Sequence, residues 1–369
     1  MKILIYILAL SSLLFANADM AACKKCHPVI SAEFETSMHK NSSVYDDKVH
    51  KAVWDLHPAK AKDDYKCAKC HTPNAKTAEQ QHVGISCINC HTIMDVEKHA
   101  QSNKNIYSTE DKKFYSAEIG RENEKVHYKK ISSMFGMSKT TVGSAYHDID
   151  YTNEKFYNGQ MCMGCHSHKQ NSHEFSVCET DKAGAQNKES NCISCHMPKV
   201  DGSATTVRLS AKHAFHGFAG ARVNPELLSK HVQLSLKKEA TGFEVVINNK
   251  TPHNLMTHPL RVVQLRTTII RDAKQIELKT HTFVKVIGKD GKPAMPWAAT
   301  EVLKDTMIKA NEKRAIKFEE TLKNGDHIEV KLGFYVVNPK ALKKLSLDGN
   351  KELEKFTILT REYFTIGQH

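Results

Sequence analysis

Residues 67–91 read CAKCHTPNAKTAEQQHVGISCINCH. This stretch contains the pattern C-x-x-C-H twice, with fifteen residues between the first histidine and the next cysteine. In this pattern two cysteine sulfurs bond the vinyl groups of a porphyrin and the adjoining histidine binds its iron, which is the attachment chemistry of c-type haem. The stretch therefore predicts two haem groups held close together by a short linker.

Three further copies of the pattern flank this pair, so the sequence predicts five covalently attached haem c groups. The predicted attachment residues are Cys23, Cys26, Cys67, Cys70, Cys87, Cys90, Cys162, Cys165, Cys192 and Cys195, and the predicted proximal iron ligands are His27, His71, His91, His166 and His196.

Structural zinc is the alternative for paired cysteines, because two thiolates at this spacing supply half of a tetrahedral site. Zinc does not require a histidine directly after each pair, yet all five pairs have one. With 22 His in 369 residues, chance would give this on the order of once in 10⁶ cases. The pattern therefore favours haem over zinc.

The first 18 residues have the features of a cleaved secretory signal peptide. Lys2 precedes an apolar run over residues 3–15, and Ala16-Asn17-Ala18 gives a small-x-small cleavage pattern. The run is short for an uncleaved membrane anchor. A lipoprotein would need Cys23, which belongs to the first haem motif. The mature protein is expected in the periplasm, without a membrane span.

The formal net charge of +12 could indicate a polyanionic partner. Removal of Lys2 leaves +11, and five haems bring about two propionates each, roughly −10 if all ionise. The lysine excess is therefore interpreted as a solvated surface and a counter-charge to propionates. Nucleic-acid binding is not expected.

Cysteine usage divides the chain, because all eleven cysteines precede residue 200. The expected fold is α+β, with a mainly α or irregular multihaem domain over residues 19–225 and a β-domain over residues 226–369. Short helices are expected at residues 29–40 and 48–56. Residues 100–145 form a polar insertion, interpreted as a solvated loop or, alternatively, as a docking surface or pocket lid.

From about residue 231 apolar and polar residues alternate, which is typical of strands with one buried face. Val232, Leu234 and Leu236 are one such set. Asn324-Gly325 predicts a hairpin turn between the strands on either side. About seven short strands at this spacing favour an immunoglobulin-like β-sandwich.

Several segments together resemble multihaem cytochromes of the cytochrome c-554/c-prime class over roughly residues 20–220. This resemblance implies haems with two axial histidines in closely packed pairs, sometimes with one five-coordinate haem. The C-terminal part resembles the β-domain appended to some of these cytochromes, in which a loop histidine precedes a strand that begins with arginine. The segments are Cys23-Lys-Lys-Cys-His27 with Ser37-Met-His39, Gly84-Ile-Ser-Cys87, Cys192-Ile-Ser-Cys-His-Met-Pro198, and Asn248-Asn-Lys-Thr-Pro-His253 with Arg261.

The resemblance also suggests distal iron ligands. His213 competes with His216, which is preferred because His216-Gly-Phe-Ala-Gly220 matches the fuller pattern. For the fifth position His57 competes with His50 and His99, and an open position is an equal alternative. Cys178 is the one cysteine outside the motifs and is interpreted as an inert small residue. The distal candidates are His39, His147, His216, His253 and His57.

Three functions follow from these features. The first is a periplasmic pentahaem electron carrier between a quinol-linked or cytochrome donor and a terminal redox partner. The second is a multihaem oxidoreductase that acts on a small nitrogen or sulfur species at a five-coordinate haem; no C-x-x-C-K motif is present. The third makes the β-domain a docking module for a partner or a second copy, which is compatible with the first. An electron-transfer protein is favoured over an enzyme.

Overall fold

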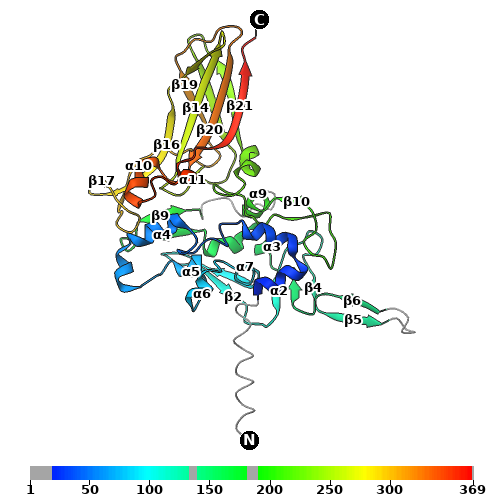
Figure 1. Ribbon diagram of the computed structural model, residues 1–369. Coiled ribbons are helices and arrows are strands. Elements are labelled where there is room, and N and C mark those ends of the chain that lie inside the picture. Colours follow the sequence, from blue (N-terminus) through cyan, green and yellow to red (C-terminus); the bar gives the residue numbers. More distant parts are fainter. Residues whose placement is uncertain (1–18, 133–138, 181–189, 368–369) are drawn as a thin grey trace. The chain divides into compact units, whose positions relative to one another are not determined.

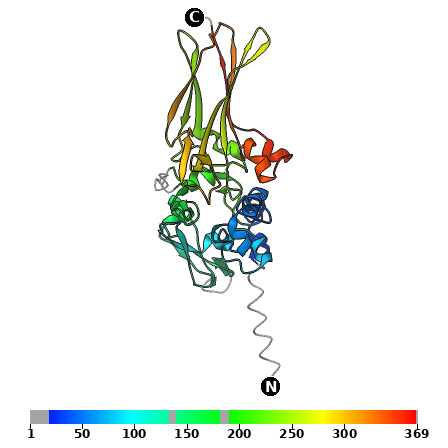
Figure 2. The same ribbon diagram turned by 90° about the vertical axis from the view of Figure 1, so that its left-hand side faces the viewer.

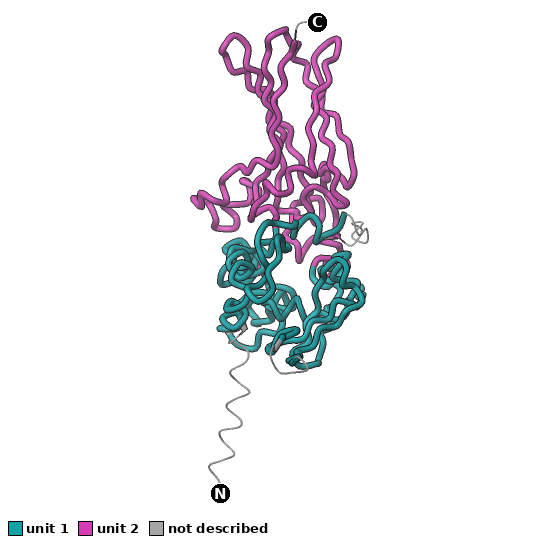
Figure 3. Tube along the Cα trace, turned by 90° about the vertical axis from the view of Figure 1, so that its right-hand side faces the viewer, with its two compact units in different colours: residues 1–54, 58–165, 185–218 teal, residues 55–57, 166–184, 219–369 magenta. Residues whose placement is uncertain are grey.

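A computed structural model of the chain describes residues 19–132, 139–180 and 190–367. The expected signal peptide at residues 1–18 lies outside these ranges. The chain divides into two compact units of mixed helix and strand (Figure 3). Unit 1 comprises residues 1–54, 58–165 and 185–218, and unit 2 comprises residues 55–57, 166–184 and 219–369. The boundary expected at 225/226 stays a prediction; the units change over at 218/219 and unit 2 also takes in residues 166–184.

Unit 1 contains short helices only, the longest described ones having eight residues. Pro28 starts one of them, where its missing N–H costs no hydrogen bond and its fixed φ suits a first turn. No described helix is long and apolar enough to cross a membrane. The helices are α2 (Asp19–Cys26), α3 (Pro28–Glu35), α4 (Lys48–Asp55), η1 (Pro58–Lys62), α5 (Ala68–His71), α6 (Ala78–Gln81), α7 (Cys87–His91), α8 (Lys155–Asn158), η2 (Gln160–Gly164) and α9 (Cys192–His196).

The polar insertion of unit 1 contains strands where a solvated loop was expected. Strand β3 runs parallel to β7, which also pairs with β4. The β5–β6 hairpin projects from the rest of the unit (Figure 1). The strands of unit 1 are β1 (Ile93–Glu97), β2 (Lys104–Tyr107), β3 (Lys113–Tyr115), β4 (Lys125–Val126), β5 (Lys129–Ser132), β6 (Lys139–Val142), β7 (Asp148–Asp150), β10 (Lys199–Asp201) and β11 (Lys212–Ala214).

Unit 2 is built on two antiparallel sheets, which appear as two layers in Figure 2. One has the order β12-β13-β19, and the other has the path β17-β16-β14-β20-β21, with β15 beside β14 and β18 beside β16. Its strands are β12 (Val232–Lys238), β13 (Phe243–Asn249), β14 (Val262–Arg271), β15 (Lys274–Glu277), β16 (His281–Lys289), β17 (Lys292–Pro293), β18 (Glu301–Asp305), β19 (Lys313–Phe318), β20 (His327–Tyr335) and β21 (Thr357–Thr365).

The two sheets share one hydrophobic core. Val232 and Leu234 of β12 are buried, as their alternation predicts, and Val245 and Ile247 of β13 are fully enclosed. They pack in the same cluster as residues of the other sheet, including Leu265. Sheets with one buried face stabilise each other in this way because neither could cover its apolar side alone.

The prediction that Asn324-Gly325 forms the turn of a hairpin between its flanking strands is wrong. Gly325 does lie in a turn with φ +86°, but β19 pairs with β13 and β20 pairs with β14 and β21. The eight residues from 319 to 326 are long enough to carry the chain from one sheet to the other. Asp326, which is buried, anchors the end of this connection by accepting two hydrogen bonds from Arg271.

The remaining elements of unit 2 are short. The β8 (His168–Gln170) and β9 (Ser176–Glu179) hairpin is tied to the unit by Asn171, whose side-chain N–H groups donate to the carbonyls of Pro296 at 2.9 Å and Ala299 at 2.7 Å. The helices are η3 (Pro225–His231), α10 (Pro339–Leu342), η4 (Lys343–Leu345) and α11 (Lys351–Glu354).

Candidate haem-binding sites

Two C-x-x-C-H motifs form short helices that carry their own caps. In α7 the hydroxyl of Ser86 accepts from the N–H of Asn89, whose side chain accepts from the N–H of Ser86 at 2.8 Å. In α9, Asn191 and Ser194 make the same reciprocal pair. The variable residues of these two motifs therefore satisfy backbone groups that a five-residue helix would otherwise expose.

Cysteines from different motifs lie in contact within unit 1. The thiol of Cys165 hydrogen-bonds to Cys70, and that of Cys162 hydrogen-bonds to Cys192. Burial raises the pKa of the neighbouring Cys90 thiol to about 11. Motifs that are far apart in sequence thus bring their attachment sulfurs together.

Gly159 and Gly164 permit this close approach. Gly159 has φ +77°, and a side chain there would stand 2.9 Å from the Cβ of Cys192. A side chain at Gly164, inside the fourth motif, would overlap Asn105 of β2. The amide of Asn105 also reaches the sulfur of Cys165 at 3.5 Å, so the insertion packs directly on this motif.

The rings of His91 and His216 lie at a spacing that would suit two ligands of one iron. Two imidazoles on opposite faces of an iron have centroids about 6 Å apart, because each metal–nitrogen bond is about 2 Å and a ring nitrogen lies about 1 Å from its centroid. The two centroids are 6.4 Å apart and the ring planes differ by 16°. The Nδ1 of His91 donates to the carbonyl of Tyr115 at 2.7 Å, and that of His216 donates to the carbonyl of Ala214 at 2.7 Å. Each ring therefore keeps Nε2 for a metal.

His27 and His147 form a second pair of this kind, with centroids 6.3 Å apart and planes 31° apart. The Nδ1 of His27 donates to the carbonyl of Ala204 at 2.8 Å. The ring of Phe114 packs edge-on against His147 at 5.2 Å between centroids and also lies near His91. The two histidine pairs thus belong to one cluster.

Burial favours the neutral form of the imidazoles of His91, His147 and His216. It lowers the pKa of His91 and of His147, and it lowers the pKa of His216 to about 3, with the nearby His91 adding to the shift. A neutral imidazole has the ring-nitrogen lone pair that iron binding requires.

His71 has a different neighbour, His50. Both rings donate Nδ1–H to the carbonyl of Ser42, at 3.0 Å and 2.9 Å, and their centroids are 4.1 Å apart. This distance is too short for ligands on opposite faces of one iron, and the Nε2 of His50 lies 3.3 Å from the hydroxyl of Tyr65. The arrangement does not favour His50 as the partner of His71.

The other distal candidates have different neighbours. His39 of unit 1 packs edge-on against Phe218 at 4.1 Å between ring centroids. In unit 2, His57 packs against Trp297 at 4.8 Å, and the Nδ1 of His253 donates to the carbonyl of Asn254 at 2.7 Å. Buried Asn249 fixes the His253 loop by donating to the carbonyl of His253 at 3.1 Å.

The groups that hold the imidazoles were missing from the sequence prediction. They are the backbone carbonyls of Ser42, Tyr115, Ala204 and Ala214, which any residue can provide and no motif marks. Tyr115 lies in β3 of the insertion, so the segment interpreted as a loop positions a proximal histidine.

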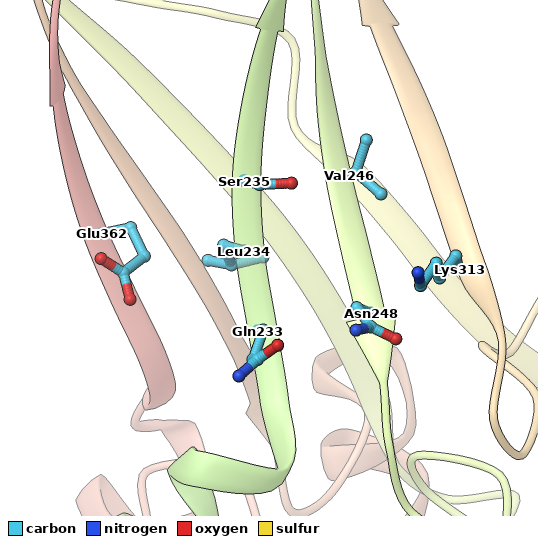
Figure 4. Close-up of a pocket in the computed structure, with 7 residues that line it drawn as sticks. All are labelled: Gln233, Leu234, Ser235, Val246, Asn248, Lys313 and Glu362. Carbon is cyan, nitrogen blue, oxygen red and sulfur yellow. The ribbon is translucent and has the colours of Figure 1, made fainter.

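A groove of about 380 Å³ lies elsewhere, on unit 2 (Figure 4). It is lined from β12, β13, β19 and β21, with Ser235, Asn248, Lys313 and Glu362 among its polar residues. None of the predicted haem residues lines it. Within residues 19–132, 139–180 and 190–367, no three His, Cys, Asp or Glu residues form a cluster suited to a bare metal ion.

The residues present fit haem. All ten motif cysteines are half-buried thiols that form no disulfide with one another, and two of the adjoining histidines have a second imidazole at a centroid distance of 6.3 or 6.4 Å, which would suit two ligands of one iron. The C-x-x-C-H motifs and these contacts define the class of protein as a multihaem c-type cytochrome.

Comparison with known proteins finds one family that the N-terminal part of the chain resembles. The family model described as cytochrome c554 and c-prime matches residues 22–92, which contain the first three motifs. The chain is thus similar to this family over residues 22–92, and its motifs are those of a multihaem c-type cytochrome, a class of protein that transfers electrons.

A solved structure shares the fold. The crystal structure of a penta-heme cytochrome c552 from Thermochromatium tepidum superimposes with a TM-score of 0.70 at 19% sequence identity, covering 95% of this chain and 99% of that one. No curated protein matched the sequence.

Proposed function

We propose that this protein is a periplasmic pentahaem cytochrome that carries electrons from a quinol-linked or cytochrome donor to a terminal redox partner. The contact between attachment sulfurs of different motifs, Cys165 with Cys70 and Cys162 with Cys192, supports this most directly. Five motifs, and the five haems named for the similar structure from Thermochromatium tepidum, support the count. When bound, haem supplies a one-electron iron couple at each site.

The polypeptide supplies the ligands and fixes their orientation. We assign His147 opposite His27 and His216 opposite His91, on the ring spacings of 6.3 Å and 6.4 Å. His39, His253 and His57 are the candidates for the remaining irons. The carbonyls that accept from Nδ1 of His27, His91 and His216 hold these three rings in one tautomer and make Nε2 the better ligand.

Unit 2 is proposed to be an immunoglobulin-like β-sandwich. The sheet orders β12-β13-β19 and β16-β14-β20-β21 support this, since an immunoglobulin fold places its first, second and fifth strands in one sheet and its third, sixth and seventh in the other. A role in docking a redox partner is compatible with electron transfer by unit 1.

The proposal is tested by asking where the reduced holoprotein delivers its electrons. Fully reduced protein is mixed by stopped flow with an oxidised monohaem c-type cytochrome, and separately with nitrite, hydroxylamine or sulfite. We expect rapid reoxidation of all haems by the protein acceptor and no reaction with the small molecules above the rate in buffer.

Fast reoxidation by one of the small molecules, together with a high-spin ferric signal that shifts when it binds, would establish the oxidoreductase instead. Retention of the protein in the cytoplasmic fraction with its first 18 residues uncleaved would overturn the periplasmic assignment.

A further inference from the structure

Two histidines three residues apart, His213 and His216, follow the fifth motif, and only one of them has a nitrogen available to iron. His213 is 3% exposed and lies in β11 opposite Val200 of β10. Its Nδ1 is 2.9 Å from the carbonyl oxygen of Gly202. Its Nε2 is 2.9 Å from a carboxylate oxygen of Glu33.

Both ring nitrogens of His213 are therefore engaged in hydrogen bonds, one with the carbonyl of Gly202 and one with the carboxylate of Glu33. Neither nitrogen is left for a metal, and burial of the ring adds to the cost of breaking these bonds.

The second oxygen of the same carboxylate binds His216. Glu33 Oε2 accepts from the backbone N–H of His216 at 2.9 Å, while the ring of His216 uses Nδ1 for its bond to Ala214 and keeps Nε2 for a metal. The side chain of Glu33 therefore engages the ring of His213, the competing histidine, and also anchors the backbone of His216.

Glu33 comes from α3, directly after the first motif, and is 183 residues from His216 in sequence. The contact fixes the segment after the fifth motif against the helix after the first. His216 in turn faces His91 of the third motif.

We propose that Glu33 is a positioning residue for the His216 ligand: its carboxylate sequesters His213 and orients His216 toward the iron site of His91. This inference rests on the proposed ligand role of His216. The carboxylate of Glu33 bonds to the ring of His213 and to the backbone of His216, and is not itself proposed as an iron ligand. Its effect on the iron would therefore be exerted through the two histidines.

The test uses electron paramagnetic resonance of the oxidised holoprotein, because the g values of a low-spin ferric haem respond to the angle between its two imidazole planes. In Glu33→Ala we expect the g values of one haem, which contributes about one fifth of the low-spin intensity, to shift from their values in the unsubstituted protein. Glu33→Gln offers an oxygen to the His216 N–H and an amide N–H to a neutral His213, so we expect it to keep the parent signal. Glu35→Gln, an exposed change in the same helix, is the matched control and should also keep it.

A Glu33→Ala spectrum identical to the parent would overturn the proposal. If that variant fails to load five haems, Glu33→Asp replaces it, because a side chain one methylene shorter cannot keep both bonds, and an unshifted spectrum there would overturn the proposal equally. His216→Ala separates the two claims. If it leaves every haem low-spin, the ligand assignment fails, whereas a high-spin haem in His216→Ala with unshifted Glu33 variants rejects only the role of Glu33.

Discussion

Replacement of His216 by Ala is expected to convert one haem in five from the low-spin to the high-spin ferric state. Its ring lies 6.4 Å from that of His91, and the bond from Nδ1 to Ala214 leaves Nε2 for the metal, so in the proposed assignment the substitution removes the sixth ligand of that iron. The covalent bonds predicted for Cys87 and Cys90 would keep the haem in place. Electron paramagnetic resonance and the visible spectrum measure the conversion, and added imidazole should reverse it.

The neighbouring histidine supplies the control. His213→Gln removes an imidazole three residues away whose nitrogens are both engaged by Gly202 and Glu33, and all five haems should stay low-spin. A high-spin haem in His213→Gln with an unchanged spectrum in His216→Ala would reverse the assignment of the two residues.

Replacement of Gly84 by Ala is expected to reduce the free energy of unfolding by about 2–4 kcal/mol. Gly84 has φ +69°, and a Cβ there would overlap the carbonyl oxygens of His39 and Lys40. The following N–H, of Ile85, donates to the same His39 carbonyl at 3.0 Å, so neither backbone can move away without losing this bond. Guanidinium unfolding of the holoprotein followed by circular dichroism measures the loss.

Gly120→Ala is the matched control for Gly84→Ala. Gly120 also has positive φ, +89°, but a Cβ there meets nothing within 4 Å, so only the conformational cost of about 1–2 kcal/mol applies. Equal losses in the two variants would show that the contact between the residue 84 turn and the His39 segment contributes nothing.

Features that short sequence patterns encode could be read from the sequence. The C-x-x-C-H motifs need only five consecutive residues to indicate haem c, although the individual attachment residues stay predictions, and the alternation at Val232 and Leu234 correctly indicated a half-buried strand. The preference for His216 over His213 stays a prediction, and the occupied nitrogens of His213 support it.

Features that depend on tertiary pairing were not predictable in the same way. Asn324-Gly325 has the composition of a hairpin turn, yet the flanking strands join different sheets, because strand partners are chosen by packing and by contacts such as Arg271 with Asp326. Glu33 and the carbonyl of Tyr115 carry no local signal, since their roles arise from contacts with residues far away in the chain.

A coulometric reductive titration of the purified holoprotein tests whether the chain is a five-haem electron carrier, because it counts the redox centres that exchange electrons. We expect an uptake of five electrons per chain, recovered fully on reoxidation, in agreement with the five C-x-x-C-H motifs. An uptake of fewer than five electrons by protein that carries its full set of covalent attachments would contradict this assignment.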